Sequence, residues 1–206
     1  IPASIQNLLN VTGMTVLNNF AASFGSDAVA AMGIAQKINT VPFQVALGIS
    51  QGIMPLISYN YASGNTRRMK KTFFFTARIS LSFLFLVMIA YLVFAGDLVR
   101  MFMDNEQIVA YGTSFLRGMC LAMPFLCMDF LAVGVFQACG LGKEAFIFAV
   151  LRKIVLEIPA LFILNWIFPL YGLAYAQLVA EVILAAAAII VLARLFRRLE
   201  RHQYPG

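Results

Sequence analysis

The sequence predicts an all-α integral membrane protein, built as a bundle of six transmembrane helices. Hydrophobic residues make up 62% of the 206 residues and charged residues only 12%, whereas soluble domains are about half apolar and a quarter charged. Apolar residues run on for about 20 positions at a time, the length that a helix needs to cross a bilayer. Backbone groups in lipid must bond within their own segment, so these runs are expected to be helices. The apolar residues do not alternate with polar ones, which argues against strands.

The expected spans cover roughly 4–24, 28–59, 70–95, 108–138, 145–166 and 172–194, and a basic tail covers 195–206.

The first expected span is the most polar of the six. In the first span, polar and soft side chains fall along one face at helical spacing, namely Asn7, Asn10, Met14 and Asn18. Amides in lipid either join helices through hydrogen bonds or line a wet pathway, and both interpretations stay open.

The second span is too long to cross a bilayer straight. It contains Pro42 and Pro55, so a bend or a tilt is expected. Ser26 and Asp27 could begin it by accepting hydrogen bonds from free N–H groups. Gly64 could end the helix, because glycine tolerates the left-handed backbone found after many helices.

The basic residues predict the orientation. They gather in alternate gaps and in the tail, at Arg67, Arg68, Lys70, Lys71, Lys143, Arg194, Arg197, Arg198 and Arg201. Loops rich in Lys and Arg usually stay in the cytoplasm. Both ends of this segment are therefore expected on the cytoplasmic side of the inner cell membrane. The net charge of +6 follows from these loops, so no nucleic-acid partner is expected.

Asp129 lies inside the fourth span, where a carboxylate costs about 2.5–3.5 kcal/mol on insertion scales. A continuous helix would place it on a stripe with Gly118, Ala122, Phe125, Val133 and Phe136. Small residues on one side and aromatic residues on the other suit the wall of a cavity for apolar guests. Asp129 is expected either to bind and release a proton or cation there, or to be tied to a lysine or to backbone.

Three other charged residues lie within expected spans. Lys37, about ten residues into the second span, is the most natural counter-charge for Asp129, although it could instead reach the interface. Glu157 stands four residues after Lys153, the spacing of an ion pair within one helix. Glu181 has no basic residue within a turn, so it needs a partner from another helix or a bound proton.

No catalytic pattern is visible. The sequence shows no Ser-His-Asp set, no zinc-ligand spacing and no phosphate-binding loop preceded by a strand. An enzyme is therefore not expected, and neither is a cofactor or a firmly bound metal.

Three stretches of the sequence resemble the multidrug and toxic compound extrusion (MATE) transporters. AVAAMGIAQKINTVPFQVALGISQGIMPLISYNYASGNTRRMKK resembles the eighth transmembrane helix of the family and the loop that follows it. VFQACGLGKEAFIFAVLRKIVLEIPALFIL and LYGLAYAQLVAE resemble the last three spans. The resemblance covers essentially the whole chain, and the two patterns together are specific.

The resemblance implies one half of a twelve-helix, two-lobe transporter, the carboxy-terminal lobe, whose partner would be an amino-terminal lobe of six helices. Family members export cationic or amphipathic compounds against protons or sodium by alternating access. The alternatives are a flippase for lipid-linked saccharides or lipids from the same superfamily and, less favoured, an integral-membrane enzyme.

The resemblance also suggests coupling residues. Asp129 falls where many members carry a cation-site aspartate, a possible sodium ligand, and Glu181 falls near an acidic position of the last helix. Asn10, followed by Val11 and Thr12, stands where the sodium-coupled branch has a glutamate. An amide cannot carry a proton, so a sodium site made by two carboxylates is disfavoured. The residues expected to line a cavity are Asn7, Met14, Asn18, Lys37, Phe125 and Phe136.

Overall fold

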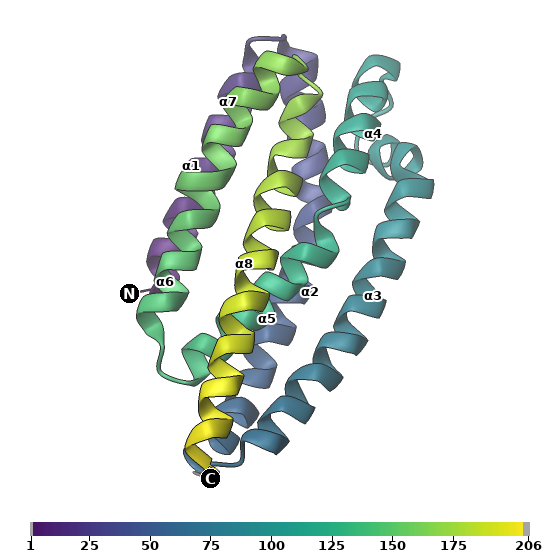
Figure 1. Cartoon of the computed structure of the whole chain (residues 1–206). Coiled ribbons are helices and arrows are strands. Elements are labelled where there is room, and N and C mark those ends of the chain that lie inside the picture. Colours follow the sequence, from purple (N-terminus) through teal and green to yellow (C-terminus); the bar gives the residue numbers. More distant parts are fainter. Residues whose placement is uncertain (1, 204–206) are drawn as a thin grey trace.

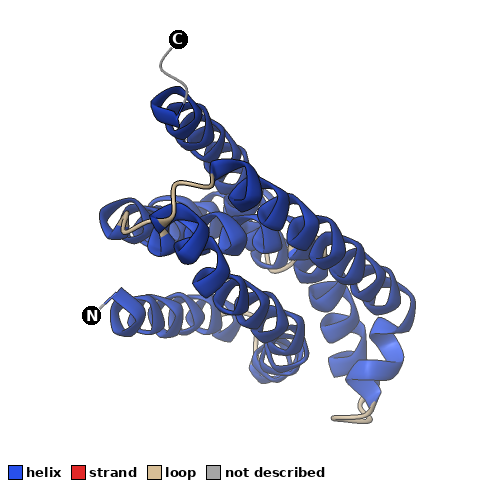
Figure 2. Cartoon of the chain, turned by 90° about the horizontal axis from the view of Figure 1, so that it is seen from below, coloured by secondary structure: helices blue, strands red, loops and turns tan. Residues whose placement is uncertain are grey.

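The computed structural model describes residues 2–203, which form helices joined by short turns and include no strand (Figures 1 and 2). In chain order they are α1 (Pro2–Ala22), α2 (Ser26–Ala62), α3 (Thr66–Arg100), α4 (Glu106–Cys120), α5 (Met123–Ala138), α6 (Gly142–Val150), the π-helix η1 (Leu151–Glu157), α7 (Ile158–Ile167) and α8 (Gly172–Gln203). With α4–α5 and α6–η1–α7 each taken as one pass, successive passes run in alternating directions along the bundle (Figure 1). The all-α prediction is confirmed.

The passes form a bundle in which α2 packs against α3, α4 and α5, and α8 packs against α5, α7 and η1. The α1 helix lies beside the α6–η1–α7 pass. The α2–α3 turn, the α5–α6 turn and the end of α8 lie toward one end of the bundle (Figure 1). These are the segments that carry most of the basic residues.

The expected span 108–138 is broken rather than continuous. The α4 and α5 helices meet at an angle of 44° across a short turn. Pro124 lies in the first turn of α5, where its missing N–H and fixed φ are tolerated, whereas the middle of a helix would not accept them. The predicted stripe through Gly118, Ala122 and Asp129 is therefore wrong, because Gly118 belongs to α4 and Ala122 lies at the bend, as the N-cap of α5.

The expected span 145–166 also departs from one regular helix. Residues 151–157 form η1, a π-helical turn between α6 and α7. Pro159, two residues after the end of η1, cannot donate the N–H that a regular α-helix would direct to the Val155 carbonyl. Wider π turns of this kind often occur at functional sites, and this one carries three charged side chains that belong to the candidate site, namely Arg152, Lys153 and Glu157.

The α2 helix starts at Ser26 as predicted, but no side chain caps it, so the capping role expected of Ser26 and Asp27 is wrong. The helix runs through both of its prolines without a break. The helix ends as expected at Gly64, which adopts the left-handed backbone conformation with φ of 69°. The Asn65 N–H closes the turn by donating to the Asn60 carbonyl at 2.8 Å.

Three described helices, α2, α3 and α8, are by themselves long and apolar enough to span a membrane, and α4–α5 qualifies as a bent pair. The α1 helix, which contains several asparagines, does not meet this criterion, and neither do the three shorter helices of the α6–η1–α7 pass. Large apolar side chains on α3 face outward, including Phe75, Leu86 and Val93, which are 69%, 65% and 63% exposed. An apolar surface of this kind fits lipid better than water.

Two apolar clusters hold the passes together. One lies between α2, α3, α5 and α8 and contains Phe73, Phe130 and Phe136. The other joins α1, α2, α4 and α7 around Met32 and Phe115. Polar groups of α1, α2, α5, η1 and α8 form the candidate site.

Candidate functional site

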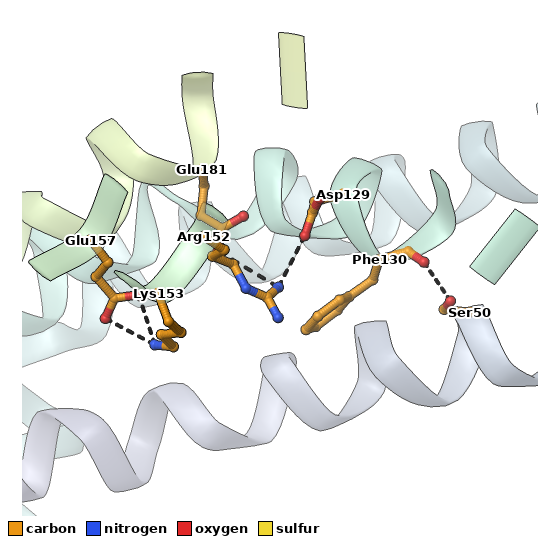
Figure 3. A network of polar contacts seen from close by, with 7 residues as sticks. All are labelled: Ser50, Asp129, Phe130, Arg152, Lys153, Glu157 and Glu181. Atoms are coloured by element: carbon orange, nitrogen blue, oxygen red, sulfur yellow. Dashed lines mark hydrogen bonds and ion pairs between the residues drawn. The ribbon is translucent and has the colours of Figure 1, made fainter. Parts of the chain in front are cut away.

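Two buried acids share one buried guanidinium (Figure 3). Asp129 on α5, Arg152 on η1 and Glu181 on α8 are only 1%, 2% and 1% exposed. Arg152 Nη1 donates to Asp129 Oδ2 at 3.0 Å and lies 3.9 Å from Glu181 Oε1. We call these three residues the charge triad. The structure thus supplies the partner from another helix that Glu181 was expected to need.

The charge triad is short of positive charge. Two carboxylates face one guanidinium, so the ionised group carries one net negative charge. Asp129 Oδ1, Arg152 Nε and Glu181 Oε2 are buried and have no hydrogen-bond partner among the described residues. Buried charges are costly unless they are paired and hydrogen-bonded. One proton or one small monovalent cation would neutralise the group.

Phe130 lies beside the triad and contacts its cation. The Arg152 guanidinium carbon lies 4.7 Å from the centre of the Phe130 ring, a cation–π contact (Figure 3). The Phe130 carbonyl accepts a hydrogen bond of 2.5 Å from Ser50 Oγ on α2. Gly134 makes this approach possible, because a Cβ at that position would collide with Ser50. The α5 helix is thereby held close to α2.

The predicted ion pair within one helical turn is confirmed. Lys153 Nζ donates to both oxygens of Glu157, at 2.7 and 2.9 Å. Arg152 and Lys153 are neighbours in η1 but point to different partners: Arg152 faces Asp129 and Glu181, whereas Lys153 faces Glu157 (Figure 3). The η1 turn therefore presents one cation to the triad and one to a cavity.

A cavity of about 380 Å³ lies between α1, α2, α4, α5, η1 and α8. Amides dominate its polar wall, namely Asn7, Asn10, Gln36, Asn39, Gln44, Gln51 and Gln177. Its apolar wall includes Met14, Phe43, Met119 and Phe130. Lys153 and Glu157 are the two charged residues that line it, and their charges cancel. The Phe130 ring is shared by the cavity and by the triad.

The structure separates the expected site residues into two places. Asn7, Asn10 and Met14 line the cavity, and their functional roles stay predictions. Asp129 and Glu181 meet in the triad, which the cavity does not reach directly, because neither residue lines it. Asn10 therefore does not share a site with Asp129.

Four expected cavity residues lie elsewhere. Asn18 is further along α1 and half-buried, and Phe125 is exposed at the start of α5. Phe136 is fully buried in the core against Phe148, with ring centres 5.5 Å apart. Lys37 is exposed on α2 and makes no ion pair with Asp129. Its expected role as counter-charge is wrong because Arg152, on η1, occupies that place.

Sequence reasoning missed Arg152 and the amide face of α2. Arg152 adjoins Lys153 within an apolar span, and a basic residue at that depth is itself a signal. Gln36, Gln44 and Gln51 recur at intervals of about two helical turns, so they could have been recognised as one face.

Residues 2–167 match the family model described as MatE. The multidrug export protein MepA of Staphylococcus haemolyticus is 35% identical over 201 residues, which are 97% of this chain and 44% of that protein. The MepA protein of Staphylococcus saprophyticus is 33% identical over 200 residues, with coverages of 96% and 44%. The chain therefore spans less than half the length of these curated relatives.

Solved structures show the same fold. The Vibrio cholerae MATE transporter VcmN in its bent form superposes with a TM-score of 0.88 at 21% identity, covering 96% of this chain and 45% of that one. A MOP superfamily transporter from Pyrococcus furiosus gives a TM-score of 0.90 at 18% identity, with coverages of 97% and 45%. These shares fit one half of a two-lobe protein. They do not bear out the carboxy-terminal assignment, which stays a prediction.

Proposed function

The chain belongs to the MatE family, and we propose on that basis that it is one lobe of a secondary active exporter of cationic or amphipathic compounds. Its relatives named as multidrug export proteins are about twice as long, so the working transporter needs a second lobe of similar size. The proposed location is the cytoplasmic membrane, with the basic turns and the end of α8 on the cytoplasmic side. A transporter of this kind needs no catalytic group and no cofactor.

The charge triad carries the proposed coupling mechanism. With both acids ionised, the triad holds one excess negative charge among buried side chains. Glu181 is the less well satisfied acid, because its nearer oxygen is 3.9 Å from the guanidinium and Oε2 has no partner in the described structure. A proton or a sodium ion arriving at the triad would therefore bind at Glu181 or between the two acids.

Binding of that ion would weaken the electrostatic attraction between the two carboxylates and the Arg152 guanidinium. Because Arg152 belongs to η1 and its ring contact, Phe130, belongs to α5 and faces the cavity, a change in the triad alters the cavity wall. The ion and the exported compound would then favour different arrangements of the bundle, which is what antiport requires. Phe130 is the shared element of the two sites.

The cavity favours an exporter over the flippase alternative. A site for a lipid phosphate needs free positive charge, but Lys153, the cation on this wall, is already neutralised by Glu157. Amides, aromatic rings and methionines instead suit varied amphipathic guests.

Uptake into inverted vesicles that contain the full-length transporter tests the proposal. A proton gradient and a sodium gradient are imposed separately, with a fluorescent organic cation as the reporter. We expect one gradient to drive uptake and the Asp129→Asn variant to lose gradient-driven uptake while its abundance in the membrane is unchanged. Wild-type vesicles that respond to neither gradient, or an Asp129→Asn variant that accumulates the cation normally, would refute it.

A further inference from the structure

The cavity wall has a carboxylate that the proposed coupling mechanism does not use. Glu157 is 6% exposed and lines the cavity, and its present partner is the primary ammonium group of Lys153. Arg152, the neighbour of Lys153, faces the triad instead. The ammonium group held against Glu157 at the cavity surface is therefore part of the protein itself, the side chain of Lys153.

Two amide oxygens in the same cavity lack a donor. Asn10 Oδ1 and Asn39 Oδ1 are buried and accept no hydrogen bond from any described residue, and both residues line the cavity. Asn39 is only 8% exposed. Gln36 Nε2, on the same wall, is a buried donor without an acceptor in the described structure. Buried polar atoms are normally paired, so this wall is prepared for a ligand that supplies hydrogen bonds.

We propose that Glu157, Asn10 and Asn39 bind an organic ammonium ion that carries at least one N–H, and that the Lys153 ammonium fills this site when no ligand is present. The inference rests on the proposed export function and specifies its substrate. The Phe43 and Phe130 rings, in edge-to-face contact at 5.0 Å, supply an aromatic surface for the apolar body of the ligand.

The N–H requirement follows from the acceptors. A carboxylate attracts any cation, but the amide oxygens of Asn10 and Asn39 are satisfied only by a donor. A quaternary ammonium ion has no N–H and pairs neither oxygen, whereas an ion with one N–H can pair one of them. Buried groups left unpaired discriminate strongly between ligands. The Gln36 Nε2 donor can serve a carbonyl or hydroxyl oxygen on the same ligand.

Lys153 acts as an internal competitor. An incoming ammonium ion must displace Lys153 from Glu157, so the measured affinity is the difference between two similar interactions. Gly13 on α1 lies against the Lys153 stem, where an added Cβ would be 3.2 Å from Cδ. If Lys153 competes with the ligand, replacing Lys153 should strengthen ligand binding and replacing Glu157 should weaken it. If the ion pair is purely structural, both replacements should weaken binding.

Equilibrium binding to the purified full-length transporter in detergent tests the proposal. The probes are two tritium-labelled ions with the same charge and ring, naphthylmethyl-dimethylammonium, which has one N–H, and naphthylmethyl-trimethylammonium, which has none. We expect the wild type to bind the first roughly tenfold more tightly, as for a lost hydrogen bond to a charged group. Asn39→Leu should reduce this preference, because it removes one acceptor.

The two members of the pair are changed next. Glu157→Gln should weaken binding of both ions by roughly tenfold or more, and Lys153→Met should tighten both severalfold. Lys37→Met is the matched control, since it removes the same charge from an exposed position of α2 outside the cavity lining, and it should change neither affinity. Equal weakening by Glu157→Gln and Lys153→Met would overturn the proposal.

Equal binding of the two ions by the wild type, or no binding of either, would also overturn it. Gradient-driven uptake of the fluorescent cation by the same preparations separates this failure from failure of the export proposal. Normal uptake by the wild type and by Glu157→Gln would remove Glu157 from the site and leave export standing. Loss of wild-type uptake under every gradient would instead refute export itself.

Discussion

Replacing Arg152 by Met should be among the most destabilising single changes in this lobe. The substitution keeps a long apolar stem, but it removes the 3.0 Å hydrogen bond to Asp129 and the contact at 3.9 Å with Glu181. Two buried carboxylates then face each other without a counter-charge. Breaking a buried pair by removing one partner costs about 3–5 kcal/mol.

Thermal unfolding of the purified full-length protein, in one detergent at one pH, measures this cost. At roughly 2–4 °C per kcal/mol for a unit of 150–250 residues, the Arg152→Met variant should unfold on the order of 10 °C lower than the wild type. The triple variant with Asp129→Asn and Glu181→Gln buries no charge, so it should recover most of the loss. Unfolding of Arg152→Met at the wild-type temperature, or no recovery in the triple variant, would refute the pairing.

Three further predictions concern stability and use the same assay. Gly134→Ala places a Cβ against Ser50 and should cost about 1–3 kcal/mol through overpacking; unchanged stability would mean that α5 and α2 are not in close contact. Gly64→Ala forces a side chain into the left-handed region, at φ of 69°, and should cost on the order of 1 kcal/mol; a stabilised variant would contradict this backbone. Glu200→Gln breaks a largely exposed ion pair with Lys70 and should change stability by less than about 1 kcal/mol; a loss of several kcal/mol would show that the pair is buried in the full protein.

Local rules explain what the sequence predicted well. Continuous apolar runs identified the helical passes, because the need to satisfy backbone groups in lipid leaves few alternatives. The pair between Lys153 and Glu157 was also predictable, since four residues along one helix bring the two side chains together whatever surrounds them. Gly64 ended its helix for the same kind of local reason.

Contacts between helices were not predictable, because they depend on how each helix is rotated. The bend before α5 and the π turn of η1 each change the direction in which later side chains point. One residue in a helix corresponds to about 100° of rotation, so a single wide turn moves a whole face. Lys37 was therefore assigned to Asp129, although Arg152 is the partner. The sequence also could not show that Asp129 lies behind Phe130 rather than on the cavity wall.

In the proposed mechanism, the charge triad takes up the coupling ion. Proton uptake and radioactive-sodium binding by the full-length protein, measured in detergent without any exported compound, test this role. The charge count predicts that the variant with both Asp129→Asn and Glu181→Gln binds about one cation fewer per molecule than the wild type, whichever ion is used. Equal uptake of both ions by the variant and the wild type would contradict the account.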